Sequence, residues 1–138
     1  MKLDLNDTAH EAALRWACEK WDSCEYERDA LRRQVYGGLD LSGEQCVAIR
    51  ALSSPALAAD LIRQLVERAG VKVRSSGVKK FGPPLKFEVA SVAFADPLGG
   101  HNGLAFGVKK IPAIIARLLD LAPNAGAEAV LKALRGEA

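Results

Sequence analysis

The first quarter of the chain carries apolar residues at alternating steps of three and four. Residues 7–35 contain no Gly or Pro and are followed by Gly37 and Gly38, which predicts one helix of about eight turns, capped by Asp7 or Thr8. The steps form a heptad seam that is interrupted by a single charged residue, Arg28. The seam consists of Leu14, Ala17, Trp21, Cys24, Arg28, Leu31 and Val35.

This apolar stripe is narrow for a helix that lies on a domain core. Acidic and basic residues four positions apart flank it, as in Glu11 with Arg15 and Asp29 with Arg33, which indicates a solvated outer face. A partner helix suits such a stripe, either from another molecule or from the same chain in a helical hairpin. The candidate protein-binding residues are Leu14, Trp21, Arg28, Leu31 and Val35.

The next segment predicts two helices separated by a short break. Ser42 followed by Gln45 is a capping-box pattern that starts a helix through about Leu52. Ser54 and Pro55 restart the helix, because Pro is tolerated at the first helical position, and Gly70 ends it. The broad apolar face of this second helix predicts packing on a core.

From residue 71 onward the period changes from helical to two. Val71 and Val73 alternate with charged residues and predict a strand, followed by a loop over 75–84 that is rich in Gly, Pro and Ser. Residues 85–95 form the strongest predicted strand, and its almost wholly apolar second half predicts a central position.

The last third predicts a loop over 96–103, a helix after Pro112, and a final helix over 125–134 capped by Asn124. The order of elements predicts an α+β fold: a helix-rich single domain with a long N-terminal amphipathic, coiled-coil-like helix and a small antiparallel sheet. We expect residues 1–38 to form a dimerisation or partner-binding arm and residues 39–138 to form the α+β body.

Composition narrows the class of protein. The 138 residues are 49% hydrophobic and 26% charged, with a net charge of +2, which predicts one globular domain without a chain-wide surface for polyanions. Charges interrupt every apolar stretch, so no membrane span is expected. Cys18, Cys24 and Cys46 show no metal-ligand or redox spacing, and the N-terminus lacks the apolar stretch of a secretory signal. These features predict a cytoplasmic protein with no metal and no cofactor.

One stretch of the chain is locally basic. Between residues 71 and 90 five cations oppose only Glu88, a local net charge of +4. A basic hairpin with Phe81 at its tip has the groups to contact a nucleic-acid backbone and stack on a base. The alternative is an ordinary solvated hairpin face with a lysine-protected edge. The candidate nucleic-acid-binding residues are Lys72, Arg74, Lys79, Lys80, Phe81 and Lys86.

The loop Gly99-Gly100-His101-Asn102-Gly103-Leu104 resembles the Gly-x-x-His-Asn-Gly-Leu signature of peptidyl-tRNA hydrolases, in which it helps to form the substrate-binding wall. The resemblance covers about six residues and implies a hydrolase centred on His101. Leu98 and Ala105 depart from the residues that the signature has at their positions, and the N-terminal strand and catalytic His-Asn pair of that family have no counterpart. A His without an orienting carboxylate or a nucleophile lacks the partners of a general base.

From these patterns we expect a small non-enzymatic regulatory or accessory protein that self-associates or binds a protein partner through its N-terminal helix. The first alternative is a nucleic-acid-binding protein that uses the basic hairpin 71–90. The second is a hydrolase centred on the Gly-Gly-His-Asn-Gly loop. No catalytic residue is assigned, and His101 is expected to be dispensable for folding.

Overall fold

The computed structural model describes residues 2–21, 41–83, 87–94 and 103–136. Five α-helices, one short 3-10 helix and three strands lie within these ranges, and they form an α+β fold as the sequence predicts. In chain order the elements are α1 (Thr8–Trp21), α3 (Gly43–Ala51), α4 (Pro55–Arg68), β1 (Val73–Phe81), β2 (Phe87–Phe94), β3 (Gly103–Phe106), η1 (Val108–Lys110), α5 (Ile111–Leu119) and α6 (Ala127–Arg135).

Side chains next to the helix starts confirm three predicted caps. The Asp7 carboxylate accepts a hydrogen bond from the Ala9 N–H at 2.9 Å, at the start of α1. Ser42 and Gln45 form the reciprocal capping box of α3, with bonds of 3.1 and 3.0 Å. The Ser54 hydroxyl accepts from the Leu57 N–H, and Pro55 occupies the first turn of α4. These short-range signals act within one turn, which is why sequence alone located them.

The sheet is antiparallel with strand order β1-β2-β3, so β2 is the central strand as predicted. β1 is longer than expected, because it continues through Ser75, Ser76 and Gly77, which the sequence placed in a loop. These small residues pair with Ala93, Val92 and Ser91 of β2. Strand propensity depends on the neighbouring strand, and here pairing with an apolar central strand outweighs the weak propensity of Ser and Gly.

A third strand, β3, is missing from the sequence-based prediction. It has four residues and begins at Gly103, the last residue of the loop predicted over 96–103. Its partners are Ala90 to Ala93 of β2, ten or more positions away in sequence. So short a segment has no period of its own, and only the long-range pairing identifies it as a strand.

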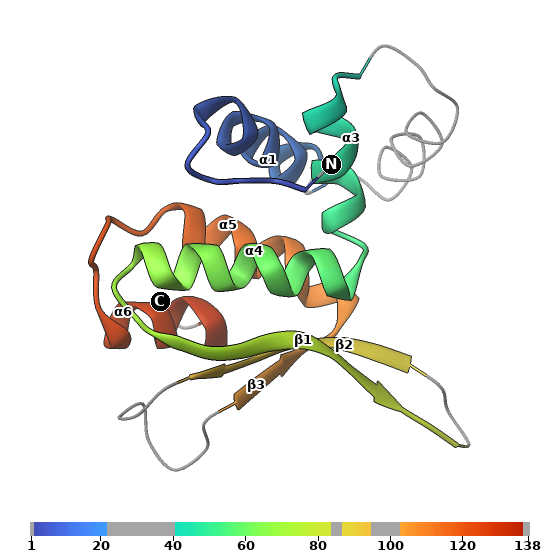
Figure 1. The fold of residues 1–138 in the computed structure, drawn as a ribbon, viewed down its shortest axis with the longest axis vertical. Coiled ribbons are helices and arrows are strands. Elements are labelled where there is room, and N and C mark those ends of the chain that lie inside the picture. The colour runs from blue at the N-terminus through green and yellow to red at the C-terminus, as the bar shows by residue number, and fades with distance from the viewer. Residues whose placement is uncertain (1, 22–40, 84–86, 95–102, 137–138) are drawn as a thin grey trace.

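A single hydrophobic core connects the sheet with all the described α-helices. Ala90, Val92 and Phe94 of β2 point from the sheet into this core, where α4 and α5 contribute their apolar faces. Figure 1 shows the helices on one side of the sheet, with α4 next to the strands and with α1 and α3 farther away. Among the described residues, no helix is both long and apolar enough to cross a membrane.

The turn between α5 and α6 differs from the prediction. Asn124 does not cap the last helix, which begins at Ala127 after Gly126. Asn124 instead adopts a φ of 60°, and its N–H donates to the carbonyl of Arg68 while the Gly126 N–H donates to Ala69. The turn therefore satisfies carbonyls at the end of α4, a tertiary contact that local sequence rules do not report.

The predicted long N-terminal helix is described only as far as Trp21. Leu14 and Trp21 are buried in the common core, where α1 lies against α3 and α5. A partner would reach these two side chains only by displacing contacts within the chain, so their predicted binding role stays a prediction. Arg28, Leu31, Val35 and the domain boundary at residue 38 lie outside the described residues.

Candidate nucleic-acid interface

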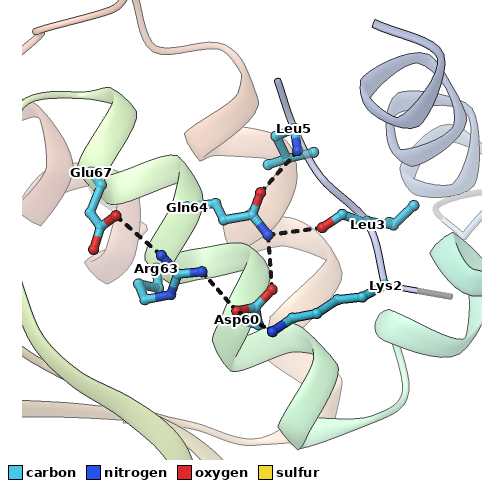
Figure 2. A network of polar contacts seen from close by, with 7 residues as sticks. All are labelled: Lys2, Leu3, Leu5, Asp60, Arg63, Gln64 and Glu67. Atoms are coloured by element: carbon cyan, nitrogen blue, oxygen red, sulfur yellow. Dashed lines mark hydrogen bonds and ion pairs between the residues drawn. The ribbon is translucent and has the colours of Figure 1, made fainter. Parts of the chain in front are cut away.

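One polar region of the described surface is a network at the start of the chain (Figure 2). The Gln64 amide on α4 accepts from the Leu5 N–H and donates to the Leu3 carbonyl and the Asp60 carboxylate, all at 2.8 to 2.9 Å. Arg63 bridges Asp60 and Glu67, and Lys2 lies 3.2 Å from Asp60. The N-terminal segment is thereby fastened to α4.

Asp60 is the centre of this network, with a side chain that is 16% exposed. Partial burial raises its pKa, but hydrogen bonds from Arg63, Gln64 and Lys2 together outweigh that influence and hold the pKa below its ordinary value. A hollow of about 550 Å³ lies here, and acidic residues alternate with basic ones along it. Because the carboxylates and cations of this network pair with one another, the network stabilises the attachment of the N-terminal segment to α4. It leaves little uncompensated charge that could bind a ligand.

A second region is the outer face of the sheet. Since side chains alternate across a strand, the residues of β2 between its core-facing positions point to the opposite face. Figure 1 shows the described helices only on the core side of the sheet, so no described helix covers this outer face. By strand register, small residues occupy its centre: Ser75, Gly77, Ser91, Ala93, Gly103 and Ala105.

Two phenyl rings stand at the tip of the hairpin on the outer face. Phe81 and Phe87 are directly paired across β1 and β2, with ring centroids 4.9 Å apart and planes inclined by 18°. They are 43% and 51% exposed, which is unusual for large apolar side chains. A hollow of about 390 Å³ is lined by both rings together with Lys80, Gly82 and Glu88. The stacked pair therefore presents an aromatic surface to solvent.

The predicted cations surround this aromatic pair unevenly. Lys79 shares the outer face with Phe81, whereas Lys80 is on the opposite face beside Glu88, at 3.8 Å. Lys72, just before β1, and Arg74, near its start, are exposed and lie roughly 23–30 Å along the strand from Phe81 at the tip. Lys72, Arg74 and Lys79 make no ion pair with any described residue, and Lys86 lies outside the described residues.

Sequence reasoning missed Phe87 as a site residue. The alternation of Leu85, Phe87 and Val89 placed it in a strand but gave no sign that its ring would be exposed. The pairing with Phe81 depends on the register across the turn, which a loop predicted over 75–84 concealed. A hairpin with one aromatic on each side of the Gly- and Pro-containing segment 82–86 would have placed the two residues opposite each other.

The hydrolase alternative receives no geometric support from the described residues. His101, Gly99 and Gly100 lie outside them. The other histidine, His10, accepts the Asp4 N–H on Nδ1 and lies 3.7 Å from Asp7, so it fastens the turn before α1. No group of three His, Cys, Asp or Glu side chains in the described ranges is close enough to hold a metal ion.

Comparison with protein-family models, with curated proteins and with solved structures finds no match. Of the surfaces described, the hairpin tip and its lysines combine the groups that sequence singled out, namely Lys79, Lys80 and Phe81, with Phe87 added by the fold.

Proposed function

We propose that the protein binds single-stranded nucleic acid through the basic hairpin formed by β1 and β2. The observation that carries this proposal is the exposed, stacked pair of Phe81 and Phe87 beside the exposed Lys79 and Lys80. Of the two lysines, only Lys80 has a described carboxylate nearby, Glu88 at 3.8 Å. Aromatic rings supply a sequence-tolerant platform for unpaired bases, and lysines neutralise the backbone phosphates.

Single strands fit this hairpin better than duplexes. A duplex keeps its bases stacked on one another, so exposed phenyl rings find no free base face there. Each base that stacks on an aromatic side chain contributes about 1–3 kcal/mol to binding. The small residues in the centre of the outer face, such as Gly77 and Ala93, leave room for a strand to approach the sheet closely.

Exposed phenyl rings also suit a protein partner, but the charges around them favour a polyanion. Among the described residues beside the rings, Lys79 and Lys80 oppose only Glu88, and Lys72 and Arg74 at the other end of the hairpin have no ion pair with any described residue. Lysine is depleted at protein–protein interfaces and enriched at phosphate contacts. A regulatory or accessory role without catalysis, and a cytoplasmic location, are parts of the same proposal.

The test uses charge reversal on the hairpin. Lys79→Glu combined with Lys80→Glu should weaken binding to a fluorescent single-stranded oligonucleotide about tenfold or more at low ionic strength, measured by anisotropy. Both side chains are exposed, and the one ion pair that is removed, Lys80 with Glu88, is a surface pair that contributes about 0–1 kcal/mol to stability. The melting temperature should therefore stay within a few degrees of the wild type.

A single reversal, Lys79→Glu, has a matched control in Lys132→Glu. Lys132 is exposed on α6 and belongs to an (i, i+4) pair with Glu128, away from the hairpin. Both variants change the net charge equally, so an effect of total charge would weaken binding equally in both. The proposal requires that only Lys79→Glu weakens binding. Wild-type protein that binds neither DNA nor RNA strands at low salt would refute it.

A further inference from the structure

We infer that a second, separate pocket at the edge of β3 binds an organic phosphate. The pocket has a volume of about 480 Å³ and lies where β3 and η1 meet α5 and α6. It follows the opposite edge of the sheet from β1, because β2 stands between the two outer strands. The inference is therefore independent of the hairpin and of the function proposed for it.

Four cationic side chains from three elements line this pocket. Lys109 and Lys110 come from η1, Arg117 from α5 and Arg135 from α6. No carboxylate lines the pocket among the described residues, in contrast to the hollow near Asp60, where Asp4, Asp60 and Glu67 accompany the cations. Like charges gathered without a counter-charge repel one another, so an anion would lower the energy of the arrangement.

Arg117 has a fixed orientation in this pocket. Its Nε donates to the Ala133 carbonyl in the last turn of α6 at 2.7 Å, and its side chain is half-buried. The two terminal nitrogens of the guanidinium have no hydrogen bond or ion pair with any described residue. A planar guanidinium held at one nitrogen keeps further donors available in a geometry that matches phosphate oxygens.

The size and the floor of the pocket indicate more than an inorganic ion. The apolar part of the lining, its floor, includes the exposed Ala105 of β3 and Ala113 of α5. Pockets for small organic ligands have volumes of about 300–1,000 Å³, whereas a single phosphate needs only a fraction of that. A ligand that joins a phosphate to an organic group fits this lining, because the phosphate can bind the cations while the organic group contacts the apolar floor. A nucleotide has this chemistry, either free or as part of a nucleic-acid strand.

The experiment titrates two probes, a fluorescent nucleoside diphosphate and a short single-stranded oligonucleotide. The protein carries Lys79→Glu and Lys80→Glu throughout, so that the hairpin contributes little. Lys109→Gln with Lys110→Gln should weaken binding of at least one probe about tenfold or more, since each charged contact to a phosphate is among the stronger hydrogen bonds. Arg135→Gln should weaken it several-fold. Arg117 is left intact because its contact with Ala133 also supports α6.

Lys132→Gln is the matched control for Arg135→Gln, because it removes one positive charge from the same helix outside the pocket. Loss of diphosphate binding in the pocket variants, but not in Lys132→Gln, identifies a free nucleotide as the ligand. Loss of oligonucleotide binding alone identifies a backbone phosphate. If neither probe binds, or if Lys132→Gln weakens binding as much as Arg135→Gln does, the inference is wrong. Melting temperatures of all variants show whether each is folded.

Discussion

On the helical side of the molecule, arginines of α1 and α4 lie against carboxylates, as with Arg68 and Glu11 at 2.7 Å and Arg63 and Asp60 at 2.8 Å. On the sheet side, Lys72, Arg74 and Lys79 have no such partner among the described residues, and Phe81 and Phe87 remain exposed. The same chain thus neutralises these charges on α1 and α4 and leaves three cations in and next to β1 without an ion pair to a described residue. Because unpaired cations do not stabilise a fold, this difference separates groups that support structure from groups available to a ligand.

The largest effect should come from placing a charge in the core of the helical side. Leu14 is fully buried, so Leu14→Asp should lower the free energy of unfolding by more than about 4 kcal/mol and leave the chain largely unfolded. Phe81→Asp is the matched change on the sheet side and should cost about 1 kcal/mol, roughly the contribution of one aromatic pair. Urea denaturation measures both. Equal losses would show that the hairpin tip is part of the core.

A smaller loss is expected when the Asp60 network is broken. Asp60→Asn should lower the free energy of unfolding at neutral pH by about 1–3 kcal/mol, since Lys2, Arg63 and Gln64 lose a charged acceptor. The folded-state pKa of Asp60 is below its ordinary value, so its contribution is complete above the ordinary value and is lost as pH falls through the folded value.

The stability difference between wild type and Asp60→Asn should therefore be largest near neutral pH and shrink as the solution becomes strongly acidic. Thermal denaturation across a pH series measures this difference. If the stability difference between the two proteins is the same at all pH values, the charge of Asp60 does not contribute to stability, and Asp60→Asn destabilises the protein through altered packing. Lys79→Gln provides the contrast on the sheet side, since no described carboxylate depends on it.

Two glycines allow the helical side and the sheet side to be compared at the level of the backbone. Gly70 ends α4 with a φ of +92°, and an added Cβ would lie 3.3 Å from Asn124, so Gly70→Ala should cost about 1–2 kcal/mol. Gly77 lies in β1 and has no atom within 4 Å of an added Cβ. Gly77→Ala should leave stability unchanged or raise it by about 0.5 kcal/mol. Melting temperatures of the two variants should move apart; a drop for Gly77→Ala as large as that for Gly70→Ala would contradict this account.

The sequence predicted the helical side more completely than the sheet side. Caps at Asp7, Ser42 and Ser54 and the apolar face of α4 are signals confined to a few turns, and the structure confirms them. The extension of β1, the existence of β3 and the turn at Asn124 depend on partners far away in sequence, and these were missed. Long-range pairing decides such elements, so local pattern cannot identify them.

In the candidate sites too, the sequence identifies residues that are neighbours along the chain, but it does not identify residues that only the fold brings together. Lys79, Lys80 and Phe81 were identified because they are neighbours along one segment. Phe87 stacks on Phe81 only through strand register, and Arg117 and Arg135 join Lys109 and Lys110 only through the packing of α5 and α6 beside β3. Composition located a basic stretch, whereas the fold determines which aromatic and cationic groups lie together.

A conservative variant tests the contribution of the stacked rings alone. Phe81→Leu preserves apolar surface but removes one aromatic face from the pair. Binding of a single-stranded oligonucleotide should weaken by about 1–3 kcal/mol, the contribution of one stacked base, while its salt dependence stays unchanged. Anisotropy titrations at several salt concentrations separate these two quantities. A change in the salt dependence without a loss of affinity would show that the ring only positions the neighbouring lysines.

The salt dependence of binding to a single-stranded oligonucleotide tests the central claim most directly. We expect the logarithm of the association constant to fall linearly with the logarithm of salt concentration, with a slope that is shallower by roughly 0.7 for each phosphate that a variant no longer neutralises. Lys79→Glu with Lys80→Glu should flatten this slope, whereas Lys132→Glu should leave it as in the wild type. Identical slopes in all three proteins would contradict the assignment of nucleic-acid binding to the hairpin.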